Sequence, residues 1–157
     1  AEISAGTWVA IALTGSGFSG SAAAIAFGLF WVVITIGRVF GGFVVESIGR
    51  YRTILLSAII TAVGILIFML ADVIALPLLG LVLWGLGMSM GFPMAVSAMS
   101  DDPKRAPFRI NMIITVVYIS SITVGPVLGS VGEFTGLYVA FAIPLALMVL
   151  SAVLSPV

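Results

Sequence analysis

Few side chains in this sequence could perform chemistry, and Glu2 and Trp8 stand first among them. The 157 residues include six Lys and Arg, six Asp and Glu, and no histidine or cysteine. The usual general base and metal ligand are therefore missing from the chain, as are disulfides and thiol chemistry. A carboxylate at membrane depth is costly, so Glu2 is a candidate functional group, although it could instead lie at an interface. The indole of Trp8 could stack on a ring-shaped solute or serve in packing.

Further candidates share helical faces. Four small or polar residues recur at every fourth position, which places them on one side of a helix. They are Gly85, Ser89, Pro93 and Ser97. This side is polar and easily kinked, which suits a cavity wall, but such residues also serve helix packing. Asn111, Thr115 and Tyr118 lie on one side of the next apolar segment. These positions could line the path of a solute, or, for Asn111, meet lipid headgroups.

Enzymatic chemistry is not expected. The sequence "GFSG" at residues 17–20 matches the surroundings of the serine in rhomboid-type intramembrane proteases. That serine needs a histidine base for its activation, and this chain has none. The sequence also contains no phosphate loop, dinucleotide fingerprint or metal-ligand cluster. We therefore expect no cofactor, no metal and no catalytic residue.

Composition indicates the class of protein. The chain is 62 % hydrophobic and 8 % charged, with a mean hydropathy of +1.35. Soluble domains carry about 25 % charged residues, so this chain cannot cover a water-facing surface. The net charge is zero, which gives no indication of nucleic acid binding. The sequence starts at Ala1 and shows no signal peptide, so either its start was processed or it is a piece of a longer protein.

Apolar runs close to the length needed to cross a lipid bilayer, about 20 residues, follow one another along the chain. We predict six transmembrane helices, so the fold class is an all-α membrane protein. The predicted helices cover residues 3–17, 21–45, 53–71, 74–98, 107–131 and 136–155. Breaks such as "GSGFSGS", "SIGRYR" and "SDDPKRAPFR" separate them.

The basic residues lie in or beside two of the five breaks. They are Arg38, Arg50 and Arg52 at the second break, and Lys104, Arg105 and Arg109 at the fourth. Alternate loops lie on the same side of a membrane, and positive charge favours the cytoplasmic side. We therefore predict that the loops at about 46–52 and 100–109 are cytoplasmic and that the other three are external.

An internal repeat relates the two halves of the sequence. The stretch "GRVFGGFVVESIGRYR" at 37–52 is echoed by "GPVLGSVGEFTGLY" at 125–138. Gly37 and Gly41 match Gly125 and Gly129, whose spacing allows close helix packing. A second match, E-x-x-G-x-Y, follows both pairs. An offset of three helices predicts a 3+3 inverted repeat, the arrangement of many transporters. In the second copy, Pro126 and two apolar residues replace the arginines, as an external position would favour.

The loop sequence "GGFVVESIGRYR" resembles the cytoplasmic signature of the major facilitator superfamily. Its signature positions are occupied by Gly42, Glu46, Gly49, Arg50 and Arg52. Glu46 replaces the usual aspartate and Ser47 the usual basic residue. The pair Gly125 and Pro126 resembles the glycine–proline motif of this superfamily. The opening "EISAGTW" resembles the seventh helix of a branch near the fucose permeases, which often has an acid where Thr7 stands here.

The resemblance implies the C-terminal half of a twelve-helix carrier, whose N-terminal six-helix half is the missing partner. Such a carrier in the cell membrane is a secondary active transporter, moving a sugar or other small metabolite by alternating access with proton or ion coupling. Drug or metabolite efflux is an alternative, and a non-transporting sensor or assembly protein is another. Arg50 and Arg52 would pair with Glu46 or a neighbouring carboxylate to stabilise one state, or would only anchor the topology.

Overall fold

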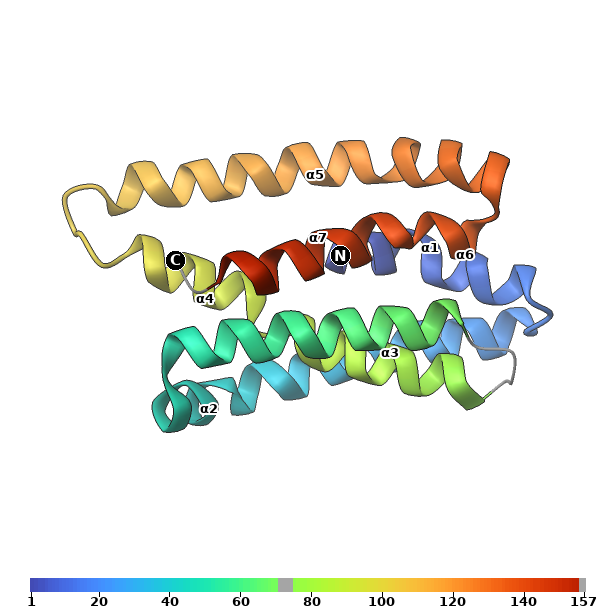
Figure 1. The fold of residues 1–157 in the computed structure, drawn as a ribbon, viewed down its shortest axis with the longest axis horizontal. Coiled ribbons are helices and arrows are strands. Elements are labelled where there is room, and N and C mark those ends of the chain that lie inside the picture. Colours follow the sequence, from blue (N-terminus) through green and yellow to red (C-terminus); the bar gives the residue numbers. More distant parts are fainter. Residues whose placement is uncertain (71–74, 156–157) are drawn as a thin grey trace.

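The computed structural model describes residues 1–70 and 75–155, and every element in these ranges is a helix. The helices are α1 (Glu2–Gly15), α2 (Gly20–Met69), α3 (Ala75–Met88), α4 (Gly91–Met99), α5 (Ala106–Thr135), α6 (Leu137–Ala140) and α7 (Ala142–Leu154). Most of the third predicted break, including Asp72, lies outside the described residues. The helices run along the long axis of the molecule (Figure 1).

The longest helix, α2, consists of two arms. Its 50 residues include one non-helical position, Gly49, with φ 82° and ψ 161°. Backbone of this kind is almost confined to glycine, since a Cβ would be strained there. The chain reverses direction at this point, at the end of the molecule where Figure 1 labels α2. The predicted segments 21–45 and 53–71 are thus the two arms, residues 20–48 and 50–69.

Two further breaks have local causes. Gly136, with φ 89° and ψ 144°, separates α5 from α6. Between α3 and α4 the helix is interrupted at Ser89 and Met90. Pro93 lacks the N–H that would bond the carbonyl of Ser89, which weakens the helix at that point. Pro126, in contrast, lies inside α5 without ending it.

Within residues 1–70 and 75–155, four stretches are long and apolar enough to cross a membrane. They are Gly20–Met69, Leu76–Met99, Ala106–Thr135 and Leu137–Leu154. The first of them contains both arms of α2, and α1 has 14 residues, fewer than the about 20 that span a bilayer. The described residues therefore form an all-helical membrane protein.

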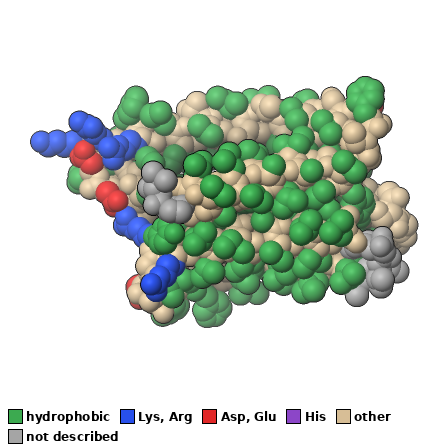
Figure 2. Space-filling view, in the orientation of Figure 1, with side chains coloured by type: hydrophobic (Ala, Val, Ile, Leu, Met, Phe, Trp, Pro, Cys, Tyr) green, Lys and Arg blue, Asp and Glu red, His purple; other side chains and the backbone are tan. Residues whose placement is uncertain are grey.

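Connections that are alternate in sequence lie at the same end of the molecule. Figure 1 places the reversal within α2 and the α4–α5 connection at one end, and the α1–α2 and α5–α6 connections at the other. Charged side chains gather at the first of these ends, and the face seen in Figure 2 is otherwise mainly hydrophobic. The two ends of the bundle are thus chemically different.

An aromatic cluster forms the core. The indole of Trp84 in α3 lies 5.9 Å from the rings of Phe30 and Phe68, one from each arm of α2. Phe141, between α6 and α7, lies 5.5 Å away on a further side. All three contacts are edge-to-face, and such pairs contribute about 0.5–1.5 kcal/mol each beyond burial. Trp84 and these three rings are fully buried, so they fix the positions of α2, α3 and α7.

Glycine makes the contact between α3 and the second arm of α2 close. A Cβ on Gly80 would lie 2.7 Å from the backbone nitrogen of Phe68, and one on Gly64 would lie 2.8 Å from the carbonyl oxygen of Gly80. A Cβ on Gly87 would lie 2.7 Å from the carbonyl oxygen of Ser57. Backbones approach this closely only where side chains are absent, which is how membrane helices gain packing energy.

Helix α5 is less buried than the other three candidate membrane spans. Only 6 % of its most apolar stretch is buried, against 44 % for Leu76–Met99. Its exposed apolar side chains include Ile119 and Ile122. Figure 1 shows α5 along one edge of the molecule. One long apolar face of the described bundle is therefore uncovered.

Candidate functional site

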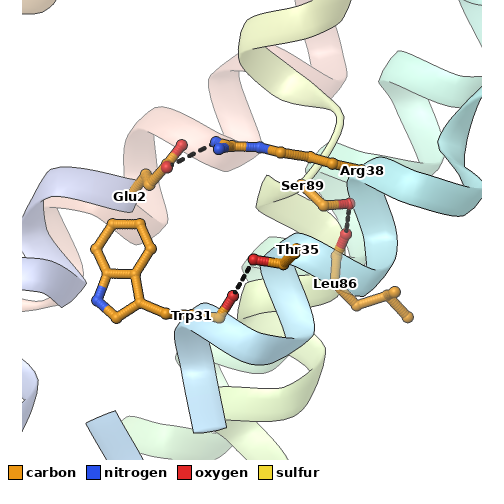
Figure 3. Close-up of polar contacts among 6 residues, drawn as sticks. All are labelled: Glu2, Trp31, Thr35, Arg38, Leu86 and Ser89. Carbon is orange, nitrogen blue, oxygen red and sulfur yellow. Dashed lines mark hydrogen bonds and ion pairs between the residues drawn. The ribbon is translucent and has the colours of Figure 1, made fainter. Parts of the chain in front are cut away.

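An ion pair joins α1 to the first arm of α2. Nη2 of Arg38 donates to Oε1 of Glu2 over 2.8 Å, and the two side chains are 41 % and 21 % exposed (Figure 3). The charge pattern of the sequence placed Arg38 beside the second break, but it lies 11 residues before Gly49 within the helical arm. That is about 16 Å along a helix. Arg38 is therefore a charge within an apolar helix, and its partner is the acid already singled out.

This pair lies in a cavity of about 590 Å³. Residues from α1, α2, α3, α4, α5 and α7 line it. Apart from Ala1, Glu2 and Arg38, the lining consists of Ile3, Trp31, Met88, Phe92, Ala95, Ile113, Val116, Val117, Ser120 and Met148. Ser120 contributes the one hydroxyl group among these side chains. The cavity therefore offers one acid, one base and a largely apolar wall.

Two neighbouring hydroxyl groups already donate to backbone carbonyl groups. The hydroxyl of Thr35 donates to the carbonyl oxygen of Trp31 over 2.9 Å, and that of Ser89 to the carbonyl oxygen of Leu86 over 2.6 Å (Figure 3). A guanidinium has five N–H donors and a carboxylate two acceptor oxygens, so one shared hydrogen bond leaves both groups with unused capacity. Among the described residues that line this cavity, the pair and the hydroxyl of Ser120 are where a polar ligand could bind.

Trp8 lies in a second cavity, of about 600 Å³, which Glu133 and Gly129 also line. A Cβ on Gly129 would lie 3.0 Å from the indole ring, so α1 and α5 meet at this point. The indole N–H of Trp8 is buried and has no hydrogen-bond partner in the described part of the chain. Such a donor can bind a carbonyl or hydroxyl group of a ligand.

The remaining predicted pathway residues lie elsewhere. Ser89 is buried against Gly37. Four others do not line the cavity of Glu2 and Arg38: Pro93, Ser97, Asn111 and Tyr118. Tyr118 is 67 % exposed on the outside of α5.

The glycines predicted to pack helices differ in their surroundings. A Cβ on Gly37 would collide with Ser89, and one on Gly41 with Met90. A Cβ on Gly125, which precedes Pro126, would meet nothing within 4 Å. Close helix contact therefore occurs at the first of the two repeated glycine pairs and, through Trp8, at Gly129.

The loop motif contains a second ion pair between distant segments. Nη1 of Arg50 donates to both carboxylate oxygens of Asp101, over 2.8 and 2.9 Å. This contact ties the reversal within α2 to the α4–α5 connection. In the described residues neither Glu46 nor Arg52 forms an ion pair. A Cβ on Gly42 would meet nothing within 4 Å.

The fold and site together describe a helical membrane protein with a charged pair inside an apolar cavity. The family model of the Major Facilitator Superfamily matches residues 3–157, so the chain belongs to this superfamily. The chain is also 30 % identical over 136 residues to an uncharacterized MFS-type transporter of Yersinia pestis. The match covers 85 % of this chain and 35 % of that protein, so the chain spans about a third of its relative's length. No solved structure matches.

Sequence reasoning missed Arg38 and the apolar residues around it. Arg38 was assigned to the nearest loop, although an arginine 11 residues from the loop glycine lies well inside an apolar run. A basic residue at that depth needs a partner, and Glu2 is an acid at the start of another apolar segment. That pairing is the signal that could have identified the site. Trp31 and Phe92 carry no comparable signal.

Proposed function

We propose that this chain is the C-terminal six-helix half of a secondary active transporter that moves a small solute, a sugar or other metabolite, by alternating access. Transport is coupled to protons or another ion. The observation that carries the proposal is the Glu2–Arg38 ion pair in an apolar cavity of a superfamily member. Charges inside membrane bundles are costly and mark solute or proton pathways. The opening motif with Glu2 and Trp8 favours the fucose permease-like branch.

The assignment to half of a carrier is supported by length and by surface. The matched relative is about three times as long as the stretch aligned here. The apolar surface of α5 is hardly covered by the rest of the described chain. An N-terminal half of six helices would cover this face and complete the cavity, as the superfamily resemblance implies. Lipid would surround the other faces.

The inverted repeat is supported by equivalent contacts. Gly49 and Gly136, which match in sequence, both have positive φ between two helical stretches. Gly41 in the second predicted segment faces Met90 in the fourth. Its counterpart Gly129 in the fifth segment faces Trp8 in the first. In each copy the middle segment thus contacts the first segment of the other copy, as a 3+3 inverted repeat requires.

The charged end of the bundle is proposed to be cytoplasmic, in the cell membrane. The reversal within α2 and the α4–α5 connection lie together at this end, and they carry most of the basic residues (Figures 1 and 2). Positive charge favours the cytoplasmic side. The Arg50–Asp101 pair would then stabilise one state of the carrier from that side.

Two other functions remain alternatives on the same scaffold: an efflux carrier, and a sensor or assembly protein that moves no solute. The test is solute flux in proteoliposomes that contain the full-length protein carrying this chain. Uptake of a solute that rises with an imposed pH gradient supports the proposal. Transport only toward the outside supports efflux. No flux of any sugar, organic acid or amine in a broad panel contradicts transport.

The double variant E2Q/R38Q is the control for this flux. It replaces the ion pair by two neutral polar side chains, so neither charge is left unpaired. We expect it to insert and fold but to lose coupled transport. Flux of this variant equal to that of the wild type would show that transport does not depend on the Glu2–Arg38 pair.

A further inference from the structure

Glu2 and Arg38 differ in one property that decides how their ion pair can open. A guanidinium stays protonated at all physiological pH values, whereas a carboxylate can take up a proton. The Arg38–Glu2 contact can therefore be broken from the side of Glu2 alone. Protonation of Glu2 leaves Arg38 as an uncompensated cation in a cavity whose wall is largely apolar. The side chain of Arg38 is 41 % exposed in this chain alone. Once the proposed N-terminal half closes the cavity, such a charge is unfavourable unless an anion replaces the lost carboxylate.

We propose that the cavity binds a small apolar monocarboxylate on Arg38 and that binding is coupled to the uptake of one proton by Glu2. This inference rests on the proposed function and names its substrate class. Arg38 donates one hydrogen bond to Glu2, through Nη2. Its planar fork can donate two parallel hydrogen bonds to an incoming carboxylate, the geometry for which arginine is best suited.

The wall of the cavity selects the rest of the molecule. Trp31, Phe92 and Val117 are typical of its lining, and Figure 3 shows the indole of Trp31 beside Glu2. These side chains suit an aromatic or aliphatic body. A sugar would need hydrogen-bond partners for several hydroxyl groups, and Ser120 is the one hydroxyl in the described lining. Between a sugar and another metabolite, the part of the cavity that this chain forms therefore favours an apolar organic anion.

The exchange balances in atoms and charge. An O–H bond forms on Glu2, the hydrogen bond between Arg38 and Glu2 breaks, and Arg38 bonds the substrate carboxylate instead. The cavity keeps its net charge, since one proton and one anion enter together. Transport of one proton together with one monocarboxylate across the membrane is therefore electroneutral. The other charged group that faces Glu2 in the described chain is the amino group of Ala1, which becomes a neutral peptide group where a residue precedes it.

The test is equilibrium binding to the full-length protein in detergent at pH 7.5 and pH 6.0. Radiolabelled benzoate and hexanoate are the probes, with benzamide and benzylamine as neutral and cationic counterparts of benzoate. We expect wild-type affinity for both carboxylates to rise about tenfold per pH unit lowered, as one-to-one proton linkage requires. The variant E2Q imitates protonated Glu2, so it should bind benzoate tightly and equally at both pH values.

Two further variants serve as controls. D102N removes a carboxylate outside the cavity and should keep the pH dependence of the wild type. E2Q/R38Q should fold, as judged by gel filtration, and lose benzoate binding by at least tenfold. The proposal is overturned if benzamide or benzylamine binds as well as benzoate, or if E2Q retains the pH dependence. It is also overturned if neither carboxylate binds to the wild type at pH 6.0 or to E2Q.

Flux of the same probes separates this proposal from transport itself. Carboxylate binding without flux in proteoliposomes would support the proposed carboxylate site and contradict the transporter function. Flux of a sugar or amine without carboxylate binding would support the transporter function and contradict the proposal that the substrate is an apolar monocarboxylate. Coupled flux of benzoate that generates no membrane potential would support both.

Discussion

Gly49 and Gly136 have nearly the same backbone conformation, although they lie 87 residues apart in the sequence. Their φ and ψ angles are 82° and 161° at Gly49, and 89° and 144° at Gly136. Each ends one long helical stretch and starts the next. Each also holds the same place in the repeated sequence pattern E-x-x-G-x-Y. The match in sequence therefore corresponds to a match in local geometry, at opposite ends of the bundle (Figure 1).

Replacing either glycine by alanine should destabilise the protein. Neither position is crowded, because an added Cβ would meet nothing within 4 Å, so the cost is backbone strain alone. Residues in this region of φ and ψ cost about 1–3 kcal/mol when they are not glycine. We expect G49A and G136A to lower the thermal unfolding midpoint of the full-length protein in detergent by similar amounts.

The matched control is G28A. Gly28 lies within a helical arm, and a Cβ there would also meet nothing within 4 Å. Alanine is the better helix former, so this variant should be neutral or slightly stabilising. If G49A or G136A behaved like G28A, the strained backbone at these two turns would be refuted.

Close helix packing gives a second prediction, which compares two crowded glycines. A Cβ on Gly64 would collide with the backbone of Trp84, whereas one on Gly41 would collide with the flexible side chain of Met90. A methionine can change rotamer, but a backbone can move only with its helix. We expect G64A to cost about 1–3 kcal/mol, as overpacking does, and G41A clearly less. Equal losses of thermal stability in the two variants would contradict this contact.

Much of the fold could be predicted from local sequence. Apolar runs predict the helical stretches, and the glycine in "SIGRYR" lies where α2 reverses. The interruption at Ser89 and Met90 was foreseen only as a kinkable face, since the effect of Pro93 falls four residues earlier. The packing of Gly64 on Gly80 was not foreseen. It depends on how two helices are rotated toward each other, which local patterns do not fix.

The site could be predicted only in part, for the same reason. Glu2 was identified because an acid in an apolar segment is costly. Its partner Arg38 is 36 residues away, and only the packing of α1 on α2 brings them together. Ser89 and Pro93 are four residues apart, which predicts that they share one helical face. The spacing does not predict which neighbouring helix that face contacts. The structure turns Ser89 toward Gly37.

Sidedness can be measured directly, because these 157 residues contain no cysteine. Single cysteines at Lys104 and at Ser16 would lie at opposite ends of the bundle, in the α4–α5 and α1–α2 connections. We expect a membrane-impermeant maleimide added to intact cells to label S16C but not K104C, and inverted vesicles to show the reverse. The cysteines of any further domains would be removed first. The opposite labelling pattern would invert the proposed topology.

The Arg50–Asp101 pair should matter more for transport than for stability. Both side chains are about half exposed, and exposed ion pairs contribute only about 0–1 kcal/mol. A shift of that size between two states of a carrier changes their ratio by up to about fivefold. We therefore expect R50Q and D101N each to slow transport by up to about fivefold, measured as initial flux in proteoliposomes, while the unfolding midpoint changes little.

Three further variants test whether the Arg50–Asp101 contact is specific to one state of the carrier or whether these residues act only as surface charges. The double variant R50Q/D101N should be no slower than either single one, since both remove the same contact. The charge exchange R50D/D101R should recover part of the rate. R105Q disrupts the Arg105–Asp102 pair, which spans 3.7 Å within one connection and joins no distant segments, so it should leave transport unchanged. Additive losses in the double variant, or an equal loss in R105Q, would mean that these charges act independently of the contact between α2 and the α4–α5 connection.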